Sequence, residues 1–314
     1  MQDVTDTSGQ PLAGLKKVDW LKKFSEITED YGTYRTLNSS HFSAYLEGDE
    51  TLLVTFETVQ GIRGLSDSAQ PLGWELTKSL GWSNLCVASD GDTWFRDNAV
   101  WDYIDELVDE GFFDEFDRII FYGAGSCGYA LARFSVGAPG CTVVVVQPQA
   151  TLDPRVTSWD DRFFDQRRLD FTSRYGFAPE MIEAAERVFV LFDPNEHLDA
   201  MHAALFQGPN VCSLRLRRLD RALQSDLMEM KILNRILRQA ETGKLSANSF
   251  AKLYRARREH PPYLYHLLSF LDADGRDALA LRLSRYVTQK MKAPRIQRQL
   301  AELNAKLGND DEAQ

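Results

Sequence analysis

Apolar residues fall into two patterns that alternate along the first two thirds of this chain. Six short runs are almost continuously apolar, and they cover residues 51–57, 84–88, 118–122, 142–147, 188–193 and 211–216. Between most of them, apolar residues recur every three to four positions, the spacing of a helix with one buried face. Continuous apolar runs are typical of strands buried on both faces of a parallel sheet. The alternation therefore predicts an α/β fold with a doubly wound, mostly parallel sheet.

The strand pattern stops after residue 219, and only helical spacing follows. Five segments carry it, at 227–237, 250–257, 263–271, 278–287 and 296–307. We therefore predict an α/β domain over residues 1–240 and a helical appendage over 241–314, frayed at 308–314. About seventy residues of short helices make only a marginal core alone, so we expect the appendage to bury its apolar stripe against the first domain. The stripe consists of Leu253, Tyr263, Leu264, Leu267, Leu268, Leu271, Leu279, Leu283 and Val287.

Charge is divided unevenly between these two parts. The whole chain carries a net charge of −10. Residues 241–314 hold 13 Lys and Arg against 9 Asp and Glu, a net +4, whereas residues 1–240 hold 23 against 37, a net −14. A basic tail on an acidic body favours docking of the tail onto that body or onto an acidic partner. General nucleic-acid binding is disfavoured, because it needs a broad positive surface.

Composition narrows the class of protein further. The 314 residues are 44% hydrophobic and 26% charged, an ordinary globular mixture, and no apolar run approaches the ~20 residues of a membrane span. Residues 1–14 lack the basic and then apolar order of a secretory signal. The cysteines have no metal-like spacing, which favours reduced, buried thiols; they are Cys86, Cys127, Cys141 and Cys212. We expect a cytoplasmic protein without metal, cofactor, nucleic-acid or membrane partner. We expect it to bind a small molecule or a protein, and the sequence leaves open whether it forms homo-oligomers.

One segment carries most of the chemical information. The apolar run 119–122 leads into a turn rich in glycine, with Gly123, Gly125 and Gly128, and a helical pattern follows directly. Ser126 and Cys127 lie inside this turn. Small residues are needed at such a strand-to-helix turn, because the chain is strained there and the flanking backbones nearly touch.

The surroundings of this turn match a known family in several places. The matching segments are Asp92-Thr-Trp-Phe95, Phe121-Tyr-Gly123, Gly128-Tyr-Ala130, Gln147-Pro-Gln149 and Phe192-Asp-Pro194. Over about residues 50–240 the chain resembles an α/β-hydrolase subgroup whose nucleophile elbow reads Y-G-x-S-x-G-G-Y-A. The resemblance implies an α/β-hydrolase-like fold. Similar sequences are sometimes labelled phosphoadenosine phosphosulfate reductases, but this chain lacks the Ser-Gly-Gly-rich phosphate loop and the C-terminal catalytic cysteine of those enzymes.

The resemblance places a glycine where the family carries its nucleophile. Alignment on the flanking Tyr-Gly and Gly-Tyr pairs puts Gly125 at the position of the nucleophilic serine. Ser126 then takes the next position, whose backbone N–H helps to stabilise the oxyanion in the family. In a second frame, small-x-Ser-x-Gly, Ser126 itself stands at the apex. The first frame keeps four flanking residues in register and is the better supported one.

The implied acid and base are not equally easy to place. α/β-Hydrolases present serine, acid and histidine in that chain order, and the histidine is needed because a neutral hydroxyl is a poor nucleophile. Asp193 follows an apolar run and suits the acid. The histidine is expected near 217–225, a stretch that contains none. The five histidines of the chain are His41, His197, His202, His260 and His266.

Two interpretations follow. In the first, the chain is a catalytically degenerate α/β-hydrolase-like protein that binds a small molecule or a protein, with Ser126 as a helix N-cap, Cys127 as a buried thiol and Asp193 as a cap after its strand. In the second, it is an active serine hydrolase of the esterase or thioesterase class, using Ser126, Asp193 and a non-standard histidine. A helix N-terminus would also lower the pKa of Cys127, which keeps a reactive thiol open.

The loop after the apolar run 51–57 also bears on the choice between a degenerate and an active hydrolase. Gln60 and Arg63 lie where the family's second oxyanion donor sits. Arg63 has two candidate roles, in binding an anion or in pairing at the surface. The feature that discriminates the two interpretations is an imidazole within hydrogen-bond reach of Ser126 or Cys127.

Overall fold

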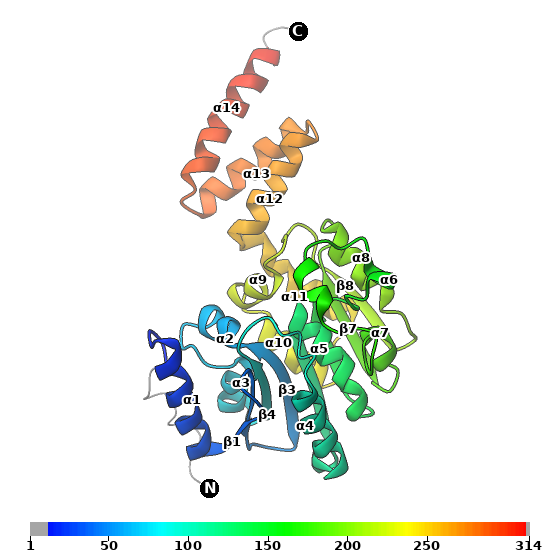
Figure 1. The fold of residues 1–314 in the computed structure, drawn as a ribbon. Coiled ribbons are helices and arrows are strands. Elements are labelled where there is room, and N and C mark those ends of the chain that lie inside the picture. Colours follow the sequence, from blue (N-terminus) through cyan, green and yellow to red (C-terminus); the bar gives the residue numbers. More distant parts are fainter. Residues whose placement is uncertain (1–11, 312–314) are drawn as a thin grey trace.

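The computed structural model describes residues 12–311, with side chains up to residue 305. Its centre is one eight-stranded sheet in the order β1-β2-β4-β3-β5-β6-β7-β8 (Figure 1). β1 and β2 pair antiparallel, β2 pairs antiparallel with β4, and all other pairs are parallel. The strands are β1 (Gly32–Thr36), β2 (His41–Leu46), β3 (Thr51–Thr58), β4 (Ser83–Ser89), β5 (Arg118–Ala124), β6 (Thr142–Val146), β7 (Arg187–Phe192) and β8 (Val211–Arg215). The predicted doubly wound, mostly parallel sheet is confirmed.

Helices cover both faces of the sheet because its strands are apolar on both. Along β3, Leu52, Val54 and Phe56 belong to one buried cluster, whereas the intervening Leu53 belongs to another. The first face is covered by α4 (Asn98–Asp109), α5 (Ser126–Phe134) and α8 (His197–Leu205). The second is covered by α1 (Lys17–Tyr31), α3 (Leu72–Leu80), α10 (Leu233–Glu241) and α11 (Ala247–Leu253).

One predicted helix differs from the structure. The predicted helix over 227–237 is two helices, α9 (Leu223–Glu229) and α10, separated where Lys231 takes a positive φ of 55°. α7 (Ala178–Met181) is a single helical turn. The remaining short helices are α2 (Val59–Leu65) and α6 (Pro154–Thr157).

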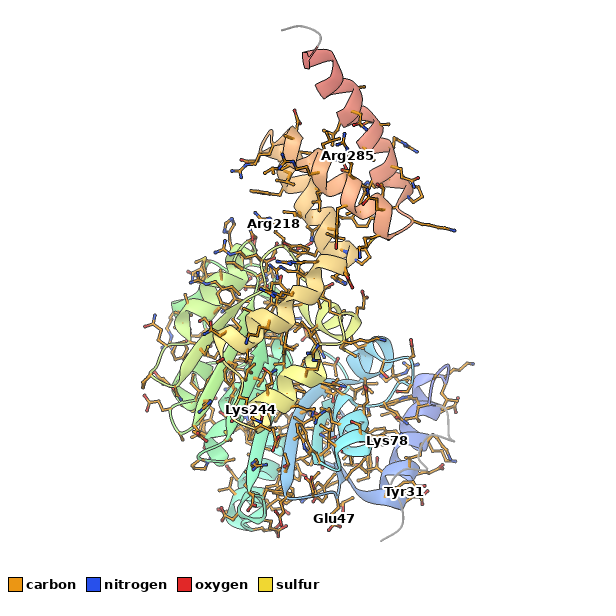
Figure 2. All side chains as sticks on the ribbon, turned by 180° about the vertical axis from the view of Figure 1, so that it is seen from behind. Tyr31, Glu47, Lys78, Arg218, Lys244 and Arg285 are labelled. Atoms are coloured by element: carbon orange, nitrogen blue, oxygen red, sulfur yellow. The ribbon has the colours of Figure 1, made fainter. Side chains whose placement is uncertain are left out.

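The C-terminal helices form a small unit of their own. α12 (Pro261–Ala273), α13 (Asp277–Lys290) and α14 (Pro294–Asp311) project beyond α9 (Figures 1 and 2). They bury Leu264, Leu268 and Val287 in a shared cluster, whereas Phe250 of α11 packs in the cluster on the sheet. Of the predicted stripe, Leu253 belongs to the cluster on the sheet and Tyr263 of α12 packs against it, whereas the other buried members pack among α12, α13 and α14. The expected packing against the first domain is therefore found only in part.

Parts of the predicted termini lie outside the described residues. These parts are 1–11, which make up most of the polar N-terminal stretch, and 312–314 at the end predicted to fray; residues 308–311 continue α14. Among residues 12–311, none of the helices has both the length and the apolar content that a membrane span requires.

Candidate functional site

The turn between β5 and α5 is strained at Gly125. This residue has φ 56° and ψ −128° and is the N-cap of α5, a backbone conformation that side chains disfavour. A Cβ added to Gly125 would meet no atom within 4 Å, so the turn has room for a side chain and lacks one. Gly123 differs, because its Cβ would lie 2.8 Å from the carbonyl oxygen of Cys127. Gly125, rather than Ser126, is therefore the residue with the strained backbone in this turn.

Ser126 and Cys127 begin the helix after this turn. Ser126 is the first residue of α5 and is partly buried, so Gly125, rather than Ser126, occupies the N-cap. Cys127 is 8% exposed. Burial, with a smaller contribution from the nearby Glu57, raises the pKa of the Cys127 thiol to about 12. Cys127 is therefore a neutral thiol at physiological pH, and the helix N-terminus does not activate it.

Asp193 directly follows β7 and is almost fully buried. Its carboxylate accepts hydrogen bonds from the backbone N–H groups of Asn195 (2.9 Å), Leu219 (2.9 Å) and Asp220 (3.1 Å). The last two donors lie in the loop after β8, the loop in which the sequence pattern leads one to expect a histidine. The carboxylate that would orient an imidazole is instead bonded to backbone of that loop.

All five histidines lie in the described part of the chain, and none of their hydrogen bonds reaches Ser126, Cys127 or Asp193. The bonds run from His41 to Asn38 (3.0 Å) and Thr93 (2.8 Å), from His202 to the N–H of Ala150 (3.1 Å) and Asp160 (2.9 Å), from His260 to Asp226 (2.8 Å), and from His266 to the carbonyl oxygen of Arg218 (3.2 Å). His197 is exposed at the start of α8. The structure therefore brings no imidazole to the elbow.

The loop expected to supply an oxyanion donor is helical. Thr58 caps α2 by accepting a hydrogen bond of 2.9 Å from the N–H of Gly61. Gln60 is exposed on this helix. Arg63 donates to the carbonyl oxygen of Leu15 at 2.7 Å and so holds the segment before α1. Of the two roles considered for Arg63, the structure shows the pairing role.

A carboxyl group stands beside the elbow instead. Glu57 lies near the end of β3, and β3 is the neighbour of β5 in the sheet. Thr55 donates a hydrogen bond to Glu57 Oε1 (2.9 Å), and the N–H of Leu72 donates to Oε2 (3.3 Å). Burial raises the pKa of this carboxyl. The sequence analysis missed Glu57, although a charged residue at the carboxyl end of a buried strand was a signal for it.

Buried polar side chains also fix the segment between β6 and β7. His202 Nδ1 accepts from the N–H of Ala150, so the other ring nitrogen, Nε2, donates to Asp160. Arg162 bridges Asp160 (2.8 Å) and Asp199 (2.6 Å). Burial alone would raise the pKa of Asp160, but the hydrogen bonds from His202 and Arg162 more than offset it and hold that pKa far below its usual range. His202 therefore has a structural partner and is not a displaced catalytic base.

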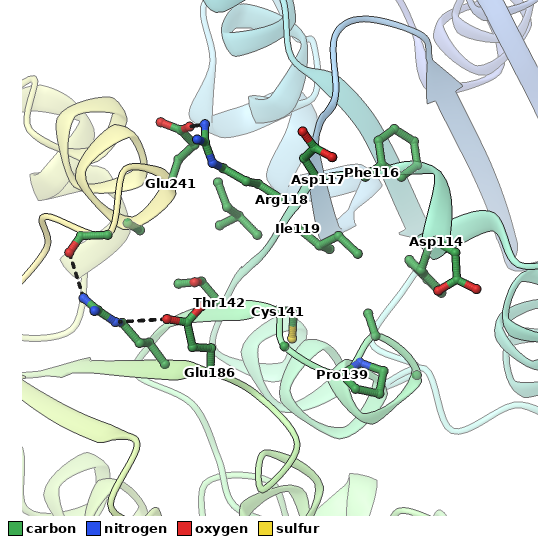
Figure 3. A pocket seen from close by; sticks show the side chains of 18 residues that line it. Asp114, Phe116, Asp117, Arg118, Ile119, Pro139, Cys141, Thr142, Glu186 and Glu241 are labelled. Atoms are coloured by element: carbon green, nitrogen blue, oxygen red, sulfur yellow. Dashed lines mark hydrogen bonds and ion pairs between the residues drawn. The ribbon is translucent and has the colours of Figure 1, made fainter.

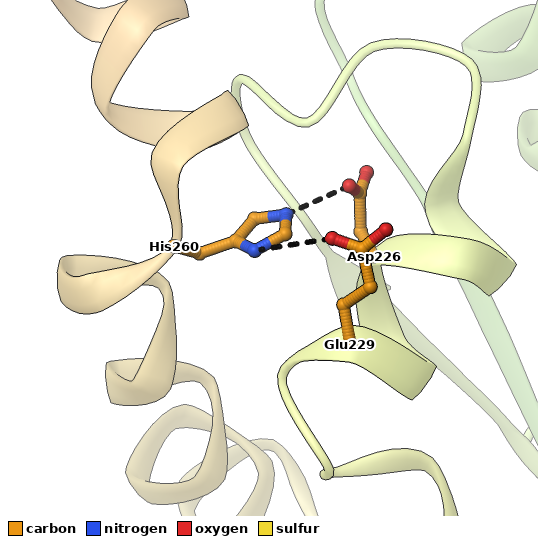
Figure 4. Close-up of side chains that lie close together, drawn as sticks. All are labelled: Asp226, Glu229 and His260. Carbon is orange, nitrogen blue, oxygen red and sulfur yellow. Dashed lines mark hydrogen bonds and ion pairs between the residues drawn. The ribbon is translucent and has the colours of Figure 1, made fainter. Parts of the chain in front are cut away.

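Asp226, Glu229 and His260 form a second group that sequence reasoning missed (Figure 4). One ligand atom from each lies within 4.8 Å of the other two, close enough in principle to hold a cation. Nε2 of His260 lies 2.8 Å from Asp226, whereas Nδ1 lies 3.9 Å from Glu229. The two carboxylates thus face different nitrogens of one ring, an arrangement that suits a bridging imidazole better than a shared ion. The group ties α9 to the start of α12.

Two of the cavities lie at opposite ends of the central strands of the sheet. One, of about 480 Å³, lies where β5, β6 and β7 begin (Figure 3). Its arginines are engaged, Arg118 with Glu241 and Arg187 with the carbonyl oxygen of Gly243 (2.7 Å). The other, of about 600 Å³, includes Glu57 and lies at the carboxyl end of β3. Ligands of open α/β sheets bind at the carboxyl ends of strands, so the second cavity is the better candidate.

The fold is similar to solved structures of α/β-hydrolases. An esterase from Pyrobaculum calidifontis matches with a TM-score of 0.45 and 12% identity, over 73% of this chain and 92% of that one. Est1E from Butyrivibrio proteoclasticus with bound ferulic acid gives 0.43 and 13%, over 66% and 99%. The mouse α/β-hydrolase domain-containing protein 10 gives 0.38 and 14%, over 66% and 98%. No family model and no curated protein matches the sequence. These scores and identities are too low to assign a reaction to this chain.

Proposed function

We propose that this protein has an α/β-hydrolase-like fold without hydrolase chemistry, and that it acts by binding a small molecule at the carboxyl edge of its sheet. The observation that carries the proposal is the glycine in the turn between β5 and α5. Gly125 keeps the strained backbone of a nucleophile position and has no side chain to attack a substrate.

The surroundings support the same conclusion. Asp193 is bonded to three backbone N–H groups, the five histidines have other partners or lie exposed, and Cys127 is a neutral thiol. Glu57 beside the turn also works against hydrolysis, because a carboxylate there would repel the oxyanion that acyl transfer generates. An unactivated Ser126 hydroxyl lacks the general base that contributes about 10²–10⁴-fold to such reactions.

Hydrolysis of p-nitrophenyl and thioester substrates of graded acyl length tests the proposal. We expect the wild-type protein and Ser126→Ala to hydrolyse them equally, at the rate of buffer with an inert protein. Ser40→Ala, which removes a partly buried hydroxyl from the loop between β1 and β2, is the matched control for the substitution itself. Turnover above background that disappears in Ser126→Ala and persists in Ser40→Ala would contradict the proposal and establish an active serine hydrolase.

A further inference from the structure

The cavity at the carboxyl end of β3 has the size of a ligand site. Its volume is about 600 Å³, within the usual range for small-molecule pockets of ~300–1,000 Å³. Three elements besides β3 form it, namely α2, α3 and α9. α9 belongs to the helices that follow the last strand, so a segment distant in the sequence closes the cavity over the end of β3.

The lining of this cavity is both apolar and acidic. Leu65, which is 40% exposed, lies in its wall, and three further apolar side chains line it, Ile62, Leu72 and Met228. Four carboxyl side chains line it as well, those of Glu57, Asp67, Glu75 and Glu229, against one cation, Lys78. Lys78 is already 3.3 Å from Gln70 Oε1. Glu229 also faces Nδ1 of His260 at 3.9 Å. The remaining carboxyl groups still outnumber Lys78, and this excess of negative charge beside an apolar wall suits a ligand with a cationic head and an apolar chain.

Glu57 is the carboxyl best placed to hold that head. Its side chain is fixed by donors on three sides, since Cys86 (3.7 Å) joins Thr55 and the N–H of Leu72. Among the side chains described, those of residues 12–305, no cationic one pairs with it. A partly buried carboxylate without a counter-charge is unfavourable, and an ammonium group from a ligand would supply the missing charge and donate to its free lone pairs.

We propose that this cavity binds a primary amine carrying an apolar chain, with the ammonium group on Glu57 and the chain against Leu65 and Met228. This inference rests on the proposed function in one respect, that the ligand is bound and not turned over. No atom of the protein need react, and the aliphatic amine is held by one charge-assisted contact and by burial of its chain.

Calorimetric titration of the full chain with n-hexylamine, with n-hexanol as the neutral probe of equal chain length, tests the inference at pH 8 and low salt. We expect hexylamine to bind and hexanol to bind at least tenfold more weakly. Glu57→Gln should weaken hexylamine binding by about ten- to a hundredfold, the usual effect of a lost hydrogen bond to a charged group. Glu183→Gln makes the same charge change at an exposed site before β7 and should leave binding unchanged.

A second variant protects the test against misfolding of Glu57→Gln. Leu65→Lys places a positive charge at the exposed wall without disturbing the interior, and it should also weaken hexylamine binding tenfold or more. Absence of hexylamine binding, equal binding of hexanol, or full binding by both variants would overturn the inference. Each of these outcomes leaves the proposed lack of hydrolysis untouched, and hydrolysis of esters would overturn that proposal without bearing on amine binding.

The pH dependence has a definite sign. Hexylamine stays charged below about pH 9, so the group that titrates on acidification is the carboxyl of Glu57. An ionised Glu57 is needed to bind the ammonium group, and affinity should therefore fall as the pH is lowered through the raised pKa of Glu57. Burial keeps the neighbouring groups neutral over this range, because it raises the pKa of Cys86, Tyr122 and Cys127 above their usual values. The remaining charged groups of the cavity are Asp67, Glu75, Lys78 and Glu229. A wild-type affinity for hexylamine that does not fall as the pH is lowered to the point where carboxyl groups are protonated would contradict the assigned role of Glu57.

Discussion

A serine placed at Gly125, in the turn between β5 and α5, should strain the protein, and under the proposed function it should not make the protein an enzyme. In Gly125→Ser the new Cβ would meet no atom within 4 Å, so steric overlap contributes nothing. The cost comes from the backbone, since φ 56° and ψ −128° lie in a region that residues other than glycine avoid. Such strain costs about 1–3 kcal/mol. At about 2–4 °C for each kcal/mol in large domains, the melting temperature should fall by several degrees.

Thermal unfolding and ester hydrolysis, measured on the same samples, check both halves of this prediction. Gly123→Ser is the contrasting variant, because its Cβ would lie 2.8 Å from a backbone oxygen and the β5–α5 contact would have to open. We expect it to be far less stable than Gly125→Ser. An unchanged melting temperature in Gly125→Ser would refute the strain argument. Ester turnover gained by Gly125→Ser would show that a base is within reach of residue 125, against the hydrogen bonding of four histidines and the exposed position of His197.

Three further outcomes are expected. Asp193→Ala should lower the free energy of unfolding, measured with urea, by on the order of 2 kcal/mol, because buried N–H groups lose their acceptor. An unchanged free energy would mean that the carboxylate is not needed to hold the loop after β8. Asp160→Asn should cost on the order of 3 kcal/mol by breaking a buried charged network, and a variant as stable as wild type would contradict that. Truncation after Gln239 should lower the melting temperature, because it removes Phe250, whose burial contributes ~1.5–3 kcal/mol. Truncation after His260 keeps Phe250 and should leave the remaining domain nearly as stable. Equal melting temperatures of the two truncated chains would contradict the division seen at α12.

Most of the sheet could be predicted from the sequence because its central strands, from β4 to β7 in the sheet order, are buried on both faces. Val143, Val144 and Val145 each have no exposed surface, and such continuous apolar runs have few other interpretations. β1 escaped prediction because it is an edge strand with the polar sequence Gly-Thr-Tyr-Arg-Thr. The break between α9 and α10 escaped as well, because it contains no glycine or proline, and Lys231 adopts the positive φ there.

The candidate site was harder to predict because much of it depends on backbone. The family resemblance, aligned on the flanking Tyr-Gly and Gly-Tyr pairs, suggested Gly125 for the nucleophile position and left Ser126 open in a second frame. The partners of Asp193 are N–H groups of a loop after a different strand, and a sequence carries no sign of which backbone group will meet a side chain. The place of Glu57 at the carboxyl end of a buried strand was a signal in the sequence, but the cavity that α9 closes over it depends on a segment distant in the chain. Spacing gave no warning of the contact between His260 and Asp226, because the two lie 34 residues apart.

Intact-mass spectrometry after incubation with a fluorophosphonate tests the central claim most directly, because this reagent reports an activated serine whatever the natural substrate. The account predicts that the folded wild-type protein keeps its unmodified mass under conditions that fully label a known serine hydrolase. A single adduct that maps to Ser126 and is absent in Ser126→Ala would contradict it.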